Sequence, residues 1–123
     1  MFEIRFYRNE KGESEIEKWV RDLAKESETN KDSRINLKKL YLYFGLLKEK
    51  GTRAGEPYMK YLEDGIWELR PVDNRVLFFY WENDTFVLLH YFRKKTQKTP
   101  KREIEKAKRN RDDLLRRIRW YHR

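Results

Sequence analysis

The 123-residue sequence contains no cysteine. This excludes disulfide bonds, thiol nucleophiles and thiolate zinc sites, and it predicts a cytoplasmic location. Histidine is scarce as well, since His90 and His122 are the two that the sequence holds. The longest wholly apolar run, residues 76–81, is much shorter than the roughly 20 residues of a membrane-spanning helix, and the amino terminus has no apolar export segment. We therefore expect a soluble intracellular protein.

Most catalytic motifs are also missing. The sequence has no P-loop, no dinucleotide-binding glycine pattern, no HExxH motif and no Ser, His and Asp set. Carboxylates of the strand-rich region are scattered, mostly at expected turns, whereas a two-metal nuclease needs them clustered. These acids are Glu63, Asp64, Glu68, Asp73, Glu82 and Asp84. The sequence thus favours a function that needs no metal and no other cofactor.

Charged and aromatic residues are abundant. Asp, Glu, Lys and Arg make up 41% of the chain, which is typical of disordered segments when apolar residues are few. However, 15% of the residues are aromatic, and each aromatic side chain buries a large apolar area. A chain of this length forms one core. We expect a single domain over residues 1–123, with residues 118–123 as a frayed tail.

The positive charge is concentrated at the carboxyl end of the chain. Residues 1–30 contain six Lys and Arg against eight acids, whereas residues 93–123 contain fourteen Lys and Arg against four acids. The formal net charge of the whole chain is +9. A polyanion such as RNA or DNA is a common reason for such a distribution, because neutralising phosphates releases condensed counterions. The alternative is a solvated basic helix without a ligand.

The amino-terminal half predicts one strand and two helices. Residues 2–7 alternate between apolar and polar, as in a half-buried strand. Ser14 and Glu17 form a capping-box pattern at the start of a helix. A second helix is expected to start at Asp32 or Ser33 and to end at Gly51. Two successive amphipathic helices indicate an αα hairpin.

The carboxyl-terminal half predicts a meander of strands followed by a helix. Strands are expected at 58–62, 66–70, 75–81 and 85–92, because these runs are rich in aromatic and β-branched residues and are separated by turn sequences. Thr99 and Pro100 then resemble the cap and first position of a helix that runs to about Arg117. The predicted class is α+β: a small antiparallel sheet, formed by the first strand and the meander, packs on the αα hairpin. A basic helix completes the chain.

Two arginines are the first candidates for chemistry. Arg70 shares one strand face with Glu68, because side chains alternate along a strand. Arg75 begins the next strand across a short turn, so the two guanidinium groups are expected near the same end of the sheet. Such a pair suits bidentate contacts to phosphate. The alternative for Arg70 is a surface salt bridge, either in the neighbourhood of Glu68 or with Glu82.

A second group of cations follows the last expected strand. Arg93, Lys94, Lys95 and Lys98 occupy four of six positions before the helix. Because a strand and a helix anchor this segment, we expect it to be better ordered than a tail, with cations that can bind a phosphodiester. A lysine among other cations also loses its proton more readily. The alternative is a solvated loop.

His90 and Tyr91 lie side by side in the last expected strand. Alternation allows one of them, but not both, to face the cations. His90 has an unperturbed pKa suited to a base, although a lone histidine in an apolar strand is commonly a packing residue. Tyr91 is a candidate for stacking on an RNA base, although many aromatic residues belong to the core.

Several segments of the sequence resemble the RelE/ParE toxin superfamily, and most closely its phage-derived HigB-like branch. The resemblance is carried in order by GTRAGEP, IWELRP, RVLFFYW and VLLHYFRKKTQKTPKREIEKAK. It implies a small antiparallel sheet on a helical hairpin and a toxin that cleaves messenger RNA in the ribosomal A site. It also implies a helix-turn-helix, HigA-like antitoxin that binds operator DNA and holds the toxin inactive.

The resemblance also assigns residues. Arg70 and Arg75 match the paired arginines of the family, the pair Lys94 and Lys95 matches its basic position after the last strand, and Lys60 matches a basic position before the ELR strand. The terminal tyrosine that some members use as an acid or base has no counterpart, because Tyr121 lies far beyond the junction. Further RNA contacts are expected from Tyr91, Arg93, Lys98, Lys101 and Arg102.

The residues and the resemblance together favour RNA cleavage without a metal. Attack by the 2′-hydroxyl requires a base, an acid and fixed cations near the phosphate. Arg70, Arg75 and the lysine pair provide cations, while His90, Lys94 and Lys95 remain alternatives for proton transfer. Two other functions stay open: inhibition of DNA gyrase by binding, as in ParE, and a non-enzymatic nucleic-acid-binding accessory role.

Overall fold

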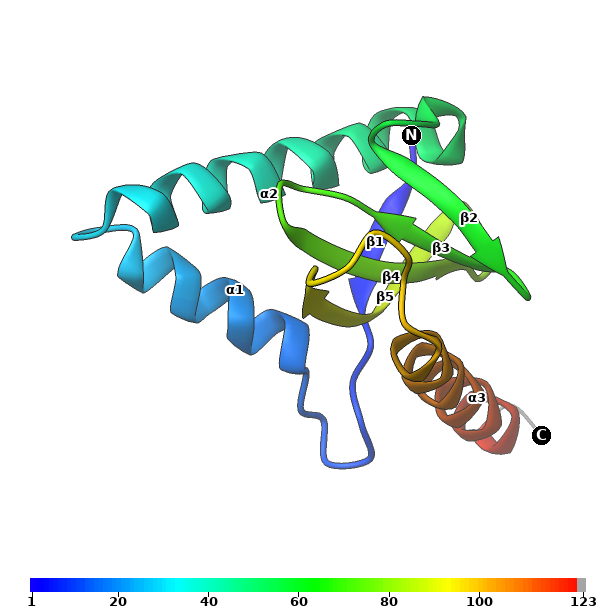
Figure 1. Ribbon diagram of the computed structural model, residues 1–123. Coiled ribbons are helices and arrows are strands. Elements are labelled where there is room, and N and C mark those ends of the chain that lie inside the picture. The colour runs from blue at the N-terminus through cyan, green and yellow to red at the C-terminus, as the bar shows by residue number, and fades with distance from the viewer. Residues whose placement is uncertain (122–123) are drawn as a thin grey trace.

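A sheet with helices on both faces forms the core of the molecule (Figure 1). The computed structural model describes residues 1–121, and over that range the fold is α+β with a five-stranded sheet. The helices are α1 (Glu15–Glu26), α2 (Lys31–Lys50), the short 3-10 helix η1 (Gly51–Ala54) and α3 (Lys101–Tyr121). The strands are β1 (Glu3–Phe6), β2 (Met59–Glu63), β3 (Ile66–Leu69), β4 (Asn74–Tyr80) and β5 (Thr85–Arg93). The predicted class is confirmed.

The order of the strands is β1-β5-β4-β3-β2. Strands β2 to β5 form the expected antiparallel meander, and β1 joins its end by a long-range pairing with β5. That pairing is parallel, which corrects the prediction of an entirely antiparallel sheet. The connection through α1 and α2 leads to β2, and the three reversals of the meander then bring the chain to β5, which runs in the same direction as β1.

The ends of α1 and α2 follow the sequence signals except at the start of α2. The Ser14 side chain accepts a hydrogen bond from the backbone N–H of Glu17, as the capping pattern predicts. Helix α2 begins at Lys31 rather than at Asp32 or Ser33, because the Asn30 side chain accepts the N–H of Ser33. The helix ends at Gly51, where φ is +62°.

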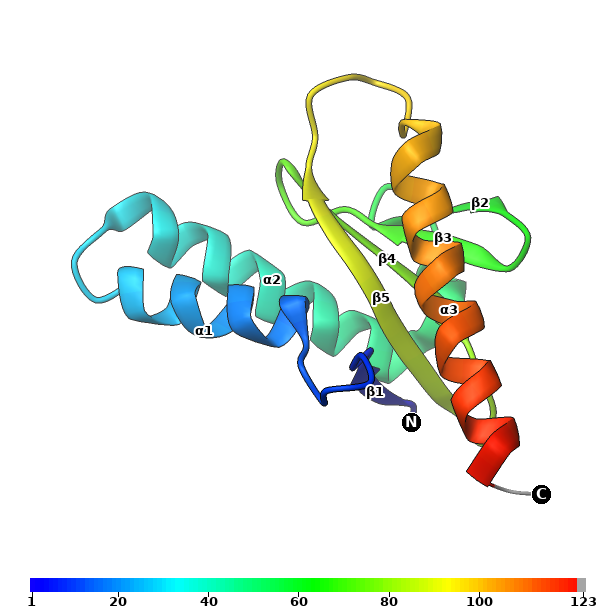
Figure 2. The same ribbon diagram turned by 90° about the horizontal axis from the view of Figure 1, so that it is seen from below.

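The two faces of the sheet have separate cores. On one face, the hairpin of α1 and α2 buries apolar residues against β2 to β5, as predicted. Leu40 and Leu47 of α2 are fully buried there. On the other face, α3 packs its buried Ala107 against Leu77 and Val87 (Figure 2). The sequence does not predict that α3 covers this second face of the sheet, because the apolar stripe of that helix is thin.

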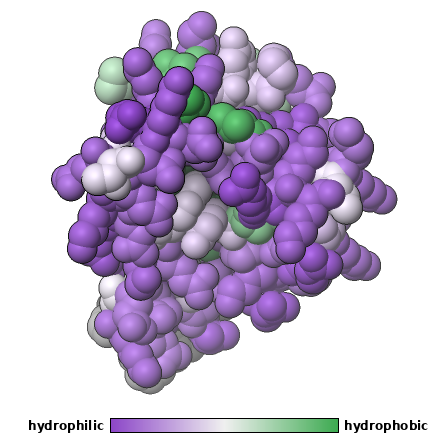
Figure 3. Space-filling view, turned by 60° about the vertical axis from the view of Figure 1, so that its left-hand side comes forward, coloured by the Kyte–Doolittle hydropathy of each residue, from purple (hydrophilic) through white to green (hydrophobic). Residues whose placement is uncertain are grey.

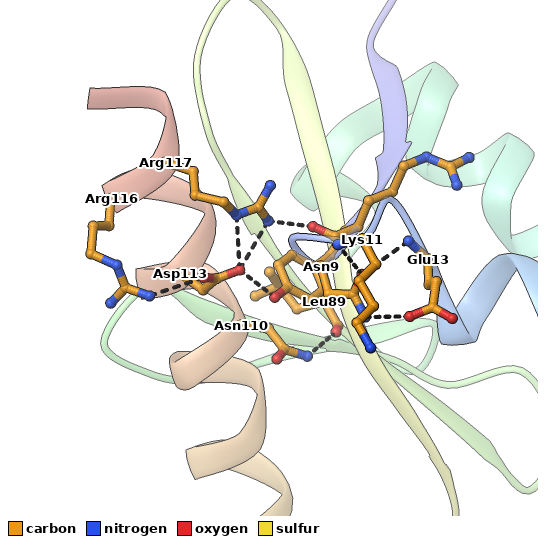
Figure 4. A network of polar contacts seen from close by, with 10 residues as sticks. Asn9, Lys11, Glu13, Leu89, Asn110, Asp113, Arg116 and Arg117 are labelled. Atoms are coloured by element: carbon orange, nitrogen blue, oxygen red, sulfur yellow. Dashed lines mark hydrogen bonds and ion pairs between the residues drawn. The ribbon is translucent and has the colours of Figure 1, made fainter. Parts of the chain in front are cut away.

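A polar network fixes α3 across the sheet (Figure 4). The Tyr7 hydroxyl donates to Asp113 Oδ2 over 2.5 Å, and Asn110 Nδ2 donates to the Leu89 carbonyl over 2.8 Å. Arg117 contacts both Asp113 Oδ2, at 2.9 Å, and the carbonyl of Arg8. These contacts attach residues 110–117 of α3 to the rest of the fold.

Helix α3 also differs from prediction in its length. It continues to Tyr121, so the helix includes residues 118–121 of the segment expected to be a frayed tail. Residues 122 and 123 of that segment lie outside the described part of the chain. None of the helices within residues 1–121 has the length and apolar character that crossing a membrane requires.

Candidate functional site

Two connecting segments meet at one end of the sheet. The turn between β3 and β4 contains residues 70–73, and the loop between β5 and α3 contains residues 94–100. The backbone N–H of Lys94 donates to the carbonyl of Asp73 over 2.7 Å. Figure 2 shows the β5–α3 loop arching from the end of β5 to the start of α3. The basic residues that the sequence places after the last strand therefore lie beside the turn between Arg70 and Arg75.

A buried carboxylate, Glu68, connects these two segments. Its exposed fraction is 1%, and it lies on the sheet face that α3 covers, in register with Lys60 of β2. The Thr99 hydroxyl donates to Glu68 Oε1, and Arg70 Nε donates to Oε2 over 3.0 Å. A buried carboxylate requires such partners, because an unpaired buried charge is strongly unfavourable. Glu68 thus orients Arg70 and fixes the end of the basic loop.

Arg70 lies partly open to solvent at this end of the sheet. Its side chain is 25% exposed, its Nε is bound to Glu68, and its Nη1 lies 3.9 Å from Glu56 Oε1. Arg70 is thus in an ion pair, as the alternative reading of its role expects, but its main partner is the buried Glu68 rather than Glu82. A guanidinium held through Nε keeps its outer nitrogens directed for bidentate contacts.

Arg75 is more buried than Arg70. It is 9% exposed, and its Nη1 donates to the carbonyls of Val72, over 2.9 Å, and Asn74, over 2.8 Å. Burial lowers the pKa of Arg75; the charge of Glu68 opposes this effect, and that of Arg70 adds to it. The two arginines are therefore neighbours, as expected, but Arg75 stabilises the β3–β4 turn while Arg70 is the more accessible of the two.

A pocket opens beside Arg70. It has a volume of about 210 Å³, and its lining includes three cations, Thr99 and one acid, Glu63, whose carboxylate pairs with Lys108. These cations are Lys60, Arg70 and Lys98. Three residues that the sequence analysis selected separately thus meet around one hollow. Cations and a hydroxyl are the groups that bind phosphate oxygens.

Other predicted cations lie in the β5–α3 loop and in the first turn of α3, but they are not among the residues that line the pocket. Lys94 is half-buried, Lys95 is exposed, and Lys101 and Arg102 are exposed in the first turn of α3. Thr99 does not cap this helix as predicted: its hydroxyl donates to Glu68, and no backbone N–H of the first turn of α3 donates to it. Instead, the carbonyl of Pro100 accepts the first N–H groups of α3.

His90 faces α3 and is bound there. Its Nε2 lies 2.7 Å from Glu103 Oε1, and its Nδ1 is buried without a hydrogen-bond partner among the described residues. Neither ring nitrogen is open to a substrate in this arrangement. The interpretation of His90 as a packing residue between β5 and α3 therefore fits the structure better than that of a base.

Tyr91 and Arg93 lie on the opposite face of the sheet from the pocket. The Tyr91 ring stacks on Trp19 of α1, with ring centroids 4.2 Å apart, and burial raises the pKa of Tyr91. Arg93 lines a groove against the helical hairpin, together with Trp19 and Glu26. Tyr91 and Arg93, which were both predicted to contact RNA, therefore do not lie at this pocket. A β-bulge beside Leu77 shifts the register between β4 and β5. Beyond the bulge, the alternation of side chains along β5 directs Tyr91 and Arg93 away from the face that holds the pocket.

Glu68 and Thr99 are the site residues that the sequence analysis missed as such. The alternation of side chains predicts that Glu68 and Arg70 share one face of the strand. An acid inside an otherwise apolar strand is the sequence signal that indicates a buried ion pair. The link from Thr99 to Glu68 spans 31 positions and has no local signal. Within the described part of the chain, no three His, Asp or Glu side chains gather in a metal-binding arrangement.

Comparison with known proteins identifies the family of the chain. A family described as "Phage derived protein Gp49-like (DUF891)" matches residues 21–112, which is about three quarters of the sequence. No curated protein matches the chain. The matched region contains the second half of α1, all of α2, the whole meander, the pocket and more than half of α3. This family is associated with RelE-type, toxin-like proteins, which agrees with the resemblance of the motifs at the level of the superfamily. The chain belongs to the phage-derived Gp49-like family.

Proposed function

We propose that this protein is a HigB-like toxin of a toxin–antitoxin system, acting as a metal-independent endoribonuclease on messenger RNA in the ribosome. The single observation that carries the proposal is the pocket lined by Lys60, Arg70 and Lys98, in which buried Glu68 orients Arg70. The Gp49-like family and its association with RelE-like toxins support it.

The proposed chemistry is cleavage by the 2′-hydroxyl of the RNA. The hydroxyl loses a proton and attacks the adjacent phosphorus, and the bond to the 5′-oxygen breaks as that oxygen gains a proton. Fixed cations stabilise the additional negative charge of the transition state. Arg70 is suited to this role because its outer nitrogens are not committed to hydrogen bonds in the described structure. Arg75 supports it by holding the adjacent turn.

Proton transfer is assigned to the loop rather than to His90. Glu103 occupies His90 Nε2, whereas the ammonium groups of Lys94 and Lys95 belong to a loop beside the pocket. A lysine is a weak base at neutral pH, so the ribosome is expected to supply much of the substrate alignment. Cleavage of free RNA should accordingly be slow.

The proposed partners are the ribosome with its messenger RNA and a helix-turn-helix, HigA-like antitoxin. The antitoxin would hold the toxin inactive and connect it to operator DNA. This assignment rests on the resemblance to RelE-type toxins and on the family association.

Induced expression in bacteria tests the proposal. Wild-type protein should arrest growth, and Arg70→Ala or Lys95→Ala should restore growth while the protein remains folded and present. Arg5→Ala and Lys11→Ala are matched controls on exposed residues away from the pocket, and they should remain toxic. Full toxicity of both site variants would contradict the proposal. Growth arrest with intact transcripts and a DNA-damage response would instead indicate gyrase inhibition.

A further inference from the structure

The outer face of α2 carries an apolar strip in which Ile35 and Leu42 are exposed and Leu46 is half-buried. Helix α2 buries Leu40, Phe44 and Leu47 on one side. Ile35, Leu42 and Leu46, at positions i, i+7 and i+11, lie on the opposite side of the same helix. Ile35 is 46% exposed and Leu42 is 61% exposed. A helix that already packs one face into a core has no folding reason for a second apolar strip.

Figure 1 shows that one side of α2 faces away from the rest of the molecule. In Figure 1, α1, η1 and the sheet lie below or at the end of α2, and nothing lies above it. Figure 3 shows hydrophobic atoms within a mainly hydrophilic surface in its upper part, at the level of α2. The helix has 20 residues, so it offers a straight surface about 30 Å long.

The charges beside the strip indicate what can bind there. Lys31, Lys38 and Lys39 lie on the same face as Ile35 and Leu42, with Glu49 near its carboxyl end. Neither Lys38 nor Lys39 makes an ion pair with another described residue. A second copy of the chain would oppose these lysines to one another and bring two chains of net charge +9 together. An acidic partner has the complementary charge.

We propose that the outer face of α2 is a docking surface for an acidic amphipathic helix of another protein. Apolar side chains of that helix would contact Ile35, Leu42 and Leu46, as in helix-in-groove recognition, and its carboxylates would pair with Lys38 and Lys39. The surface is separate from the pocket beside Arg70. The proposal therefore does not depend on nuclease activity.

Titration with a designed peptide tests the proposal on the full chain. The probe is a 20-residue helix, matching α2 in length, with Leu at heptad spacing and Glu at the flanking positions. A second peptide has Lys in place of every Glu. We expect the acidic peptide to bind and to shift the amide NMR signals of residues 31–50, while the basic peptide does not bind. Absence of binding, or shifts confined to other elements, would overturn the proposal.

Variants of the strip provide the controls. Leu42→Glu should weaken binding of the acidic peptide by about ten-fold or more, and Lys38→Glu together with Lys39→Glu should weaken it further at low salt. Leu115→Glu changes an exposed leucine of α3 and should bind like wild type. Arg70→Ala should also bind like wild type, which separates this proposal from the proposed function. If the chain alone forms dimers that Leu42→Glu dissolves, the partner is a second copy and the proposal fails.

Discussion

Glu68 shows how one buried residue organises a charged site. Its carboxylate has a partner two residues away, Arg70, and one 31 residues away, Thr99, and it lies close to Arg75. The residue types of the cationic pocket were predictable from the sequence, because strand alternation places Arg70 and Glu68 on one face. The burial of Glu68 was not, because it depends on α3 and the β5–α3 loop folding over that face.

We predict that Glu68→Gln destabilises the protein. The amide keeps the shape of the carboxylate but removes the charge that Arg70 and Arg75 face, so the free energy of unfolding should fall by about 1–3 kcal/mol. Urea denaturation measures this difference. Glu82→Gln, at an exposed turn position, is the matched control and should lie within about 0.5 kcal/mol of wild type. Equal stability of the two variants would show that Glu68 is not an organising residue.

Gly51 is a second residue whose identity the fold requires. Its φ is +62°, and a Cβ at this position would lie 2.7 Å from Cε2 of the Phe2 ring. We predict that Gly51→Ala lowers the free energy of unfolding by about 1–3 kcal/mol, through both the clash and the backbone strain. Thermal or urea unfolding provides the measurement.

Gly12→Ala separates the two causes in Gly51→Ala. Gly12 also has a positive φ, +79°, but a Cβ there would contact nothing within 4 Å. We therefore expect Gly12→Ala to show the cost of backbone strain alone, about 1 kcal/mol. A loss in Gly51→Ala no larger than that in Gly12→Ala would contradict the importance of the Phe2 contact.

Among the elements, α3 has the largest share of polar attachments. The Tyr7 hydroxyl and the Arg117 guanidinium hold the pKa of Asp113 below its usual value of 3.8. A carboxyl group with a lower pKa in the folded state stabilises the fold above its unfolded pKa. That contribution is lost as the pH falls through the folded value. Attachment of α3 should therefore weaken in acid.

We predict that Asp113→Asn flattens this acid dependence. The variant should be less stable than wild type at pH 7, and the difference should shrink as the pH falls below about 4. The free energy of unfolding between pH 7 and pH 2.5 measures it. Asp112→Asn changes the exposed neighbouring acid and should leave the profile of wild type. A constant difference between Asp113→Asn and wild type across this range would exclude the ionised Tyr7–Asp113–Arg117 network.

Most elements were predictable because their signals are local. Alternation, capping at Ser14 and the glycine at the end of α2 indicated strands and helices close to their observed bounds. The β-bulge beside Leu77 was not predictable from alternation, and it decides which face His90, Tyr91 and Arg93 occupy. The parallel pairing of β1 also depends on the whole connection rather than on the four residues of that strand.

At the scale of the whole molecule, the basic surplus predicts salt-sensitive RNA binding. The affinity for a single-stranded RNA should fall linearly on a log–log plot against salt concentration, with a slope of about −0.7 per phosphate contact. We predict that Lys98→Ala weakens binding and makes the slope about 0.7 less steep. Fluorescence anisotropy at several salt concentrations measures both quantities. Lys11→Ala should leave the slope unchanged; an equal effect of the two variants would indicate a diffuse charge effect rather than contacts at the pocket.

The central claim is that the pocket beside Arg70 cleaves messenger RNA on the ribosome. The most direct measurement maps the 5′ ends of transcripts after brief induction of wild-type protein, Arg70→Ala and Arg5→Ala at equal protein levels. The account predicts new 5′ ends within translated regions for wild type and Arg5→Ala, and none for Arg70→Ala. It would be contradicted by intact transcripts in arrested wild-type cells, or by the same new ends in cells that express Arg70→Ala.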